Sequence, residues 1–359
     1  MDTIFETRTL LEAVEELTPV SSFLLDRYFP TDMNTDVFKT PKVLVEYKKG
    51  NRKVSPFISP RVNGVTMDRE GSHMHEYEPP VTGVKRTLTI DDLEQRGFGE
   101  ALYNKLTPAE REATMLMRDM KDMQDVIRRR MEVMASQAIF ENKLVVKEYS
   151  EDGQAVTGEK EIKFYDGSAN PTVFTPATNW STTEASGKQI LSDLAAMVRQ
   201  LSKRGLPATD VLCAPDVADV LMANEYLMKL FDNRRIELGN IKPKELTDGV
   251  TAFMILNVNG RDLAFYSYDE EYEAEDGSGL KPFVPAGMIA VLAPNVGHTV
   301  FGGITQLEDD KKFHTYAGRE VPRYLVDMNS NMKMMALRSA PLTIPHNENP
   351  WVIAKVVDA

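Results

Sequence analysis

The sequence has little of three things that large classes of proteins need. It has one cysteine, Cys213, which excludes an intrachain disulfide, a CxxC metal site and a redox pair. Its longest apolar run covers residues 288–293, whereas a membrane-spanning helix needs about 20 apolar residues. Basic residues are in deficit, since 42 Lys and Arg face 54 Asp and Glu and the net charge is −12. Because phosphate contacts require Lys or Arg, this balance argues against tight binding to nucleic acid.

A signal for export is missing as well. Met1–Glu6 carries neither the basic start nor the apolar segment of a secretory signal, so we expect the protein to stay in the cytoplasm in which it is made. Hydrophobic residues make up 42% and charged residues 27% of the chain, which is typical of soluble globular proteins. The 359 residues correspond to roughly two to three domains with a packed core.

The motifs of common catalytic and nucleotide-binding sites do not occur. The sequence contains no GxxxxGKS, GxxxxGKT, GxGxxG or HExxH pattern, and Gly277-Ser278-Gly279 lacks the spacing of a nucleophile elbow. His73 and His75 lack the further ligands that zinc requires, so we interpret them as a solvated loop pair. The acids of residues 269–276 depart from the spacing of a calcium loop and are interpreted as a solvated turn. We therefore predict no catalytic, cofactor-binding or metal-ligating residue.

The first 90 residues are typical of projecting segments. A short helical pattern at residues 10–17 ends at Pro19, and an extended stretch follows to Pro41. Alternating apolar residues then predict strands at 43–47 and 84–90, on either side of a long segment that is rich in proline. Because a long structureless loop and an isolated ribbon are both unfavourable in a compact domain, we expect this segment to lie on another subunit.

The strongest helix signal covers residues 107–142. Thr107 and Glu110 form a capping box with proline at the first helical position, and no Gly or Pro interrupts the segment. Such a helix is about 50 Å long. Arg128-Arg129-Arg130 are candidates for a nucleic-acid contact, but Asp125 lies four residues before Arg129 and favours a solvated, ion-paired face. The apolar residues of one face predict core packing: Leu116, Met120, Met123, Ile127, Met131, Met134 and Ala138.

The second half of the chain has a mixed helix and strand pattern. A hairpin at 144–149 and 161–165 precedes a connector at 171–187, where we place a domain boundary. Cys213 lies in a predicted strand and is interpreted as a small buried hydrophobe. The further predicted elements are helices at 190–203 and 216–233, strands at 211–214 and 288–293, a hairpin of 252–258 with 262–268 around Asn259-Gly260, and alternating segments at 324–337 and 351–357.

Several short motifs occur in a characteristic order along the chain. They are Ser55–Arg61, Glu141-Asn142, Phe164-Tyr165-Asp166, Asn179-Trp180-Ser181, Gly205–Ala208, Ala214–Ala218, Pro341–Pro345 and Asn349-Pro350-Trp351. Together with the order of the elements, they resemble the major capsid protein E family of tailed phages, the lambda type, which has the HK97-like fold. The resemblance covers nearly the whole chain.

The resemblance implies an α+β, HK97-like capsid fold with four named parts. These are an N-terminal arm at 1–42, an extended E-loop at 43–95, a peripheral P-domain at 96–184 with the spine helix 107–142 and the hairpin 144–165, and an axial A-domain at 185–322. The C-terminal strands at 323–359 are expected to return to the P-domain.

The implied function is that of a major capsid protein. Such a protein assembles into the hexamers and pentamers of an icosahedral shell around double-stranded DNA, with no enzymatic activity, cofactor or metal. The implied partners are other copies of the chain, a separate scaffold protein, a portal and a decoration protein; packaged DNA is contacted weakly and non-specifically, and no membrane is involved. The implied location is the virion capsid, with the host cytoplasm during assembly.

Covalent crosslinks between subunits are not predicted. In some relatives a lysine of the E-loop forms an isopeptide bond with an asparagine of a neighbour, and Lys48, Lys49, Lys53 and Lys85 are available for this. The lambda type does without such bonds. Two other classes remain open: an encapsulin-like nanocompartment shell, which a bound cargo enzyme would reveal, and a soluble enzyme, which a ligand-dependent shift of the melting temperature would reveal.

Overall fold

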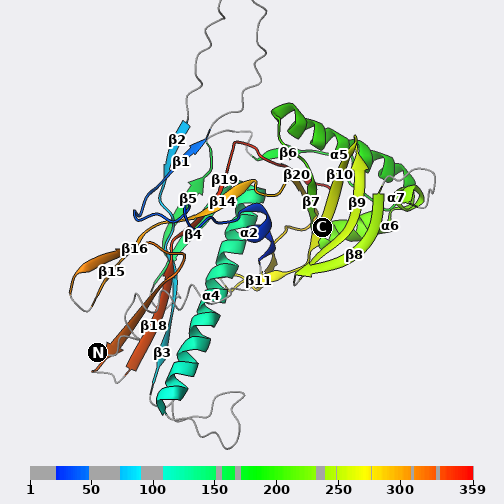
Figure 1. Cartoon of the computed structure of the whole chain (residues 1–359). Coiled ribbons are helices and arrows are strands. Elements are labelled where there is room, and N and C mark those ends of the chain that lie inside the picture. The colour runs from blue at the N-terminus through cyan, green and yellow to red at the C-terminus, as the bar shows by residue number, and fades with distance from the viewer. Residues whose placement is uncertain are drawn as a thin grey trace, which may run out of the picture. The chain divides into compact units, whose positions relative to one another are not determined.

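The computed structural model describes residues 22–47, 73–89, 108–150, 156–165, 171–231, 239–247, 249–275, 277–308, 311–328 and 332–358 (Figure 1). The helical pattern at 10–17, the loop between 47 and 73, and Lys48, Lys49 and Lys53 lie outside these residues. The chain divides into two compact units. Unit 1 draws on Met1–Val43, Glu78–Lys163 and His298–Ile344, and unit 2 on Leu44–Tyr77, Phe164–Gly297 and Pro345–Ala359. No helix of the described residues is long and apolar enough to cross a membrane.

Unit 1 is built on the long helix α4 (Pro108–Glu141), which runs alongside an antiparallel sheet with the order β17-β18-β3 (Figure 1). The sheet consists of β17 (Val321–Asp327), β18 (Met332–Ser339) and β3 (Thr82–Leu88). All seven apolar residues that the sequence places on one helical face, from Leu116 to Ala138, are buried. The prediction of this helix and of its core face is confirmed.

Charged groups also tie α4 to the sheet. One guanidinium nitrogen of Arg86 on β3 donates to Asp119 at 2.6 Å and to Asp122 at 2.9 Å. These contacts, with Asp119 the stronger, raise the pKa of Arg86. At the start of the helix, Glu112 accepts hydrogen bonds from Tyr324 and Lys333. All three strands of the sheet are thereby tied to the first half of α4.

Smaller elements complete unit 1. The hairpin of β4 (Lys143–Tyr149) and β5 (Val156–Lys163) follows α4 directly and confirms the predicted hairpin. Asn142 permits the sharp turn before it, since its φ of 56° lies in the left-handed region. The other elements are α2 (Phe23–Tyr28), the pair β14 (Gly297–Phe301) and β19 (Pro341–Pro345), and the hairpin of β15 (Ile304–Leu307) and β16 (Phe313–Tyr316).

Unit 2 contains a seven-stranded mixed sheet with the order β6-β20-β13-β7-β10-β9-β8. Its centre is mostly apolar, since Ile289 to Leu292 of β13 and Val211 to Cys213 of β7 are completely buried. Helix α5 (Glu184–Arg204) lies beside α7 (Glu225–Phe231) in Figure 1. The strands are β6 (Thr172–Phe174), β20 (Val352–Lys355), β13 (Met288–Leu292), β7 (Asp210–Cys213), β10 (Arg261–Tyr268), β9 (Val250–Val258) and β8 (Gly239–Thr247). The predicted hairpin around Asn259-Gly260 is confirmed as β9 and β10.

One predicted helix, over residues 216–233, is wrong. The structure has two helices there, α6 (Pro215–Ala223) and α7, with Asn224 in an extended conformation between them. The buried Asn224 side chain accepts hydrogen bonds from two backbone N–H groups of α7 and donates to two carbonyl oxygens before α5. A side chain that caps the start of α7 competes with the backbone bonds that would continue α6.

The structure also groups some segments differently from the expected boundaries. Strand β1 (Val43–Tyr47) pairs with β2 (His73–Tyr77), whereas β3 pairs with β18. Residues 298–322, expected in the A-domain, belong to unit 1, and the connector 171–187 lies within unit 2. Strand β20, expected to return to the P-domain, joins the sheet of unit 2, because Val352 to Ala354 are apolar and pair with both β13 and β6. A short pair, β11 (Glu271–Glu273) with β12 (Leu280–Pro282), also belongs to unit 2.

Candidate functional site

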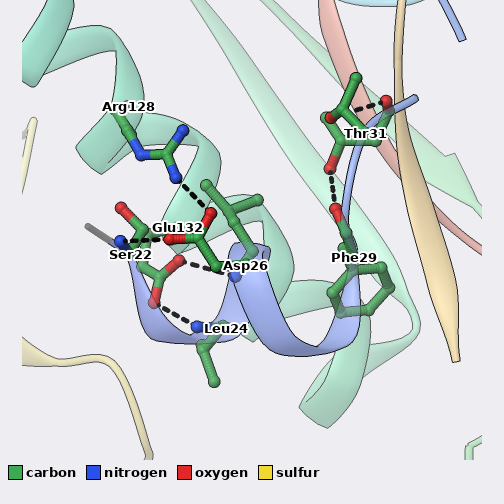
Figure 2. Close-up of polar contacts among 9 residues, drawn as sticks. Ser22, Leu24, Asp26, Phe29, Thr31, Arg128 and Glu132 are labelled. Carbon is green, nitrogen blue, oxygen red and sulfur yellow. Dashed lines mark hydrogen bonds and ion pairs between the residues drawn. The ribbon is translucent and has the colours of Figure 1, made fainter. Parts of the chain in front are cut away.

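The candidate site of unit 1 is an anchor that holds the arm helix α2 on α4. A helix leaves its first backbone N–H groups without partners, and Ser22 before α2 makes no capping bond through its side chain. The carboxylate of Glu132 on α4 takes that role, since it accepts from Leu24 N at 2.8 Å and from Leu25 N at 3.1 Å (Figure 2). Glu132 is only 2% exposed. The start of α2 therefore depends on a carboxylate more than 100 residues away.

A second carboxylate, that of Asp26, joins the two helices. Its Oδ2 accepts from the backbone N–H of Ser22 at 3.0 Å, and its Oδ1 accepts from the guanidinium of Arg128 (Figure 2). Arg128 lies four residues before Glu132, so both face α2 from one side of α4. The sequence suggested an ion pair of Asp125 with Arg129. Within the described residues that pair does not form, and Arg128 pairs with Asp26 instead.

The chain after α2 is fixed to residues 299–303. Thr31 Oγ1 donates to the carbonyl oxygen of Thr299, and Thr299 Oγ1 donates to that of Phe29. The backbone of Val37 then forms a parallel bridge with Phe301. Gly303 permits the close approach, because a Cβ there would lie 2.7 Å from the backbone of Lys39. The segment that the sequence predicts as an extended arm is therefore clamped to unit 1 along residues 29–40.

A cavity of about 180 Å³ lies under this anchor. Glu320 on its wall is 6% exposed, and burial raises the pKa of its carboxyl group. Gln124 Nε2 donates to Glu320 Oε2 at 2.8 Å, while Gln124 Oε1 is buried without a hydrogen-bond partner. The cavity is lined by Leu25, Asp26, Phe29, Pro30, Thr31, Arg128, Met131, Thr299, Phe301, Arg319 and Glu320. Among its charged groups, Asp26 binds both Arg128 and the backbone N–H of Ser22, which suits a structural lock.

The residues singled out by sequence lie apart from this anchor. Cys213 is fully buried in β7, where its Sγ donates to the carbonyl oxygen of Tyr266 at 3.1 Å and burial raises its pKa. Its interpretation as a small core residue is confirmed. His75 is not in a solvated loop: it lies on strand β2, with ring centroids 6.1 Å from Tyr77 and 5.9 Å from Tyr165. Aromatic packing accounts for this histidine.

The remaining polar candidates are dispersed. Glu270 accepts a hydrogen bond from Tyr268. Glu271 and Glu273 are exposed to solvent, but they lie on strand β11 and not in the predicted turn. Lys85 is exposed on β3. Searched over the described residues, no group of three His, Cys, Asp or Glu side chains is placed to hold a metal ion.

Large exposed apolar side chains mark candidate contact surfaces on both units. The outer face of the β1–β2 ribbon carries Leu44 and Met74, which are 55% and 56% exposed. In unit 1, Phe313 on β16 is 77% exposed and Met328 after β17 is 86% exposed. Apolar side chains of this size that are exposed on paired strands, as Leu44 and Met74 are, are candidates for a protein contact site.

Sequence reasoning missed the anchor because its bonds join distant segments. One signal was available: Glu132 stands between Met131 and Val133 in an apolar stretch, and an acid in that position needs a buried partner. The partner amides of α2 could not be named from the sequence, because backbone donors carry no residue signature.

Comparison with known proteins agrees with this architecture. The profile of the family described as Phage major capsid protein E matches residues 6–356. A prophage protein of E. coli CFT073 that is described as a putative capsid protein has a TM-score of 0.67 and 15% identity, over 98% of this chain and 99% of its own. No curated protein matches the sequence.

Two further solved structures are less similar. A phage-related protein from Bordetella bronchiseptica RB50 has a TM-score of 0.48 and 8% identity, over 97% of this chain and 96% of its own. The mature capsid of bacteriophage PhiM1 has a TM-score of 0.45 and 12% identity, over 96% and 91%. The chain itself, by the family match over nearly its whole length, belongs to the phage major capsid protein E family and is a structural capsid protein with the HK97-like fold.

Proposed function

We propose that this protein builds the icosahedral head of a tailed phage by assembling into hexamers and pentamers around double-stranded DNA. The observation that carries the proposal is the family match over residues 6–356. The exposed apolar side chains Leu44, Met74, Phe313 and Met328 support it, since a stable interface requires a buried apolar core.

We assign the β1–β2 ribbon to the root of the E-loop and propose that it contacts a neighbouring copy of the chain. One face packs inside unit 2, where Tyr77 lies 5.8 Å from the ring of Phe164. The opposite face presents Leu44 and Met74 to solvent. An isolated two-stranded ribbon is marginal in water, so burial of this second face on a neighbouring copy would stabilise it. Burying a side chain of this size contributes about 1.5 to 3 kcal/mol.

The A-domain, P-domain and E-loop assignments follow the same logic. Unit 1 with its spine helix α4 corresponds to the P-domain, and the seven-stranded sheet of unit 2 to the A-domain. We further propose that a separate scaffold protein, a portal and a decoration protein act with the chain, that assembly takes place in the host cytoplasm, and that the shell has no catalytic activity and no intersubunit crosslink.

An encapsulin-like shell remains the alternative, and the family match favours the phage head. The two differ in content, because an encapsulin-like shell encloses a cargo enzyme and a phage head encloses DNA. Shells purified from the native source and treated with nuclease would retain protected DNA if the phage assignment is correct.

A pair of substitutions tests the assembly surface. Leu44→Asp places a charge on the proposed contact face, and Val173→Asp places the same charge on another exposed strand residue of unit 2, 62% exposed. We expect sedimentation velocity and negative-stain microscopy to show shells or capsomers for the wild type and for Val173→Asp, and a shift to small species for Leu44→Asp. Equal assembly of both variants would refute the role of the ribbon face.

A further inference from the structure

We infer that the outer face of α5 is the surface of this subunit that contacts the phosphates of duplex DNA. Six residues between Ala185 and Arg204 are exposed, and four of them are cations: Ala185, Lys188, Ser192, Arg199, Lys203 and Arg204. The only acid in that stretch, Asp193, is buried and accepts a hydrogen bond from Trp180 Nε1 at 3.0 Å. Glu184, the first residue of α5, is also exposed, but its carboxylate pairs with Lys229 of α7 at 2.9 Å, so the exposed side of α5 carries a net positive charge on a chain whose net charge is −12.

The ordinary effect of helix ends explains only part of this pattern. Cations in the last turn complement the helix dipole, which accounts for Lys203 and Arg204. Arg204 is moreover engaged in the fold, since it donates to the carbonyl oxygen of Asn349 and to Thr172. The dipole does not account for Arg199 in the body of the helix or for Lys188 near its N-terminal end, where a cation is disfavoured. Lys188 also has local partners, since its Nζ lies 5.7 Å from the centre of the Tyr226 ring and, after the hydrogen bond from Lys229, its charge helps to lower the pKa of Glu184 one turn before it.

The spacing of the cations along α5 suits contact with a rod-like polyanion whose charges are regularly spaced. At 1.5 Å and 100° per residue, Lys188, Arg199 and Lys203 span about 22 Å and lie within about 60° of one another around the helix axis. Ser192 and the alanines at 195 and 196, which lie between these cations along the helix, have short side chains, so no bulky group stands between the cations. One strand of duplex DNA places a phosphate every 3.4 Å or so along its axis, so several phosphates come within reach of the three cations.

The surface continues past the C-terminal end of the helix. An open hollow of about 650 Å³ there is lined in part by Ser202, Thr209, Arg261 and Asp262. Arg261 adds a cation and the exposed Asp262, which accepts a hydrogen bond from Asn257, adds an acid, so the hollow itself contributes no net positive charge. The contrast with α4 is clear, because the exposed side of α4 mixes Lys121 and Arg129 with Asp122. A mixed face has no net attraction for phosphate.

The choice of duplex DNA as the partner rests on the proposed function, and the charge pattern alone fits other polyanions. The strength implied is low, because three phosphate contacts in an acidic subunit hold DNA only weakly. Repeated over many copies of a shell, such contacts would position the outer layer of DNA without immobilising it.

The test uses the full-length protein at a concentration at which sedimentation velocity shows it unassembled. Binding to a fluorescein-labelled 30-base-pair duplex is followed by anisotropy at several salt concentrations. The variant Lys188→Gln/Arg199→Gln/Lys203→Gln is compared with Lys121→Gln/Arg129→Gln/Lys147→Gln, which removes the same charges from exposed positions of unit 1. Melting temperatures establish that both variants are folded.

We expect the α5 variant to make the slope of log K against log salt shallower by about 2.7, which corresponds to three lost contacts at 0.9 each. The control variant should retain most of the wild-type slope. An equal loss in both variants, or no loss in the α5 variant, would overturn the inference. Displacement of the duplex by poly-glutamate at equal charge concentration would also overturn it, in favour of an acidic protein partner.

Assembly is scored separately by negative-stain microscopy at high protein concentration. If the α5 variant forms shells normally and also binds DNA like the wild type, only the role of α5 in DNA contact is refuted. A protein that binds DNA through α5 but never assembles refutes the shell function instead.

Discussion

Removing the carboxylate of Glu132 should release the arm helix from unit 1. In Glu132→Ala, the buried N–H groups of Leu24 and Leu25 lose their acceptor. A hydrogen bond to a charged group contributes about 1.5 to 3 kcal/mol, and the variant no longer bears the cost of desolvating the carboxylate. Taking the low end for both bonds, we expect a loss of about 3 kcal/mol in the free energy that holds α2 on α4.

Hydrogen exchange measured by NMR or mass spectrometry reports this loss locally. The amides of residues 24 and 25 should exchange roughly a hundredfold faster in Glu132→Ala, since 1.4 kcal/mol corresponds to a factor of ten and 3 kcal/mol to about two such factors. Glu132→Gln, which keeps one acceptor oxygen, should lie between the two. Glu141→Ala changes an exposed residue at the end of the same helix and serves as the control.

The reasoning would be refuted if these two amides stayed protected in Glu132→Ala while the variant remained folded. It would also be refuted if Glu141→Ala had the same effect, because the change would then reflect the helix as a whole. Protection of the α5 amides in unit 2 should not change in either variant.

Three further outcomes are expected. Glu320→Gln should be more stable than the wild type at pH 8 and equal to it near pH 4. Because burial raises the pKa of Glu320 in the folded state, the stability that its protonated form contributes is complete below the ordinary pKa of 4.5 and is lost as pH rises through the folded-state pKa. Urea unfolding across pH measures this, and a difference between the variants that stays constant with pH would contradict it. Gly187→Ala should destabilise unit 2 by about 1 to 3 kcal/mol in urea unfolding, because its Cβ would lie 2.4 Å from both Asn224 Oδ1 and Tyr226 Cβ; unchanged stability would show that this contact relaxes freely. Assembly should be favoured by rising salt, because screening weakens repulsion between subunits of charge −12; light scattering that falls steadily with salt would oppose this.

The elements that the sequence predicted correctly are those whose signals are local. The capping box and the unbroken period of apolar residues identified α4, and the Asn259-Gly260 pair identified the β9–β10 hairpin. The continuous apolar run at 288–293 identified β13 at the centre of the sheet. In each case the residues that define the element are neighbours in the chain.

The features that the sequence did not predict depend on distant residues. Helix α2 is only six residues long, and its first N–H groups are capped by the carboxylate of Glu132 and not by the side chain of Ser22. The break between α6 and α7 depends on the hydrogen bonds of the Asn224 side chain, two of which go to the carbonyl oxygens of Ser181 and Thr183, more than 40 residues earlier in the chain. The clamp on residues 29–40 combines two threonine hydroxyl bonds with backbone bonds near Gly303, and backbone pairing between distant segments leaves no residue pattern.

The most direct test of the central claim is to image the purified full-length protein by negative-stain electron microscopy over a range of concentrations and salt, with sedimentation velocity alongside. A major capsid protein should give closed icosahedral shells, or rings of capsomer size, in amounts that rise with concentration. A single monomeric or dimeric species under all of these conditions would contradict the account.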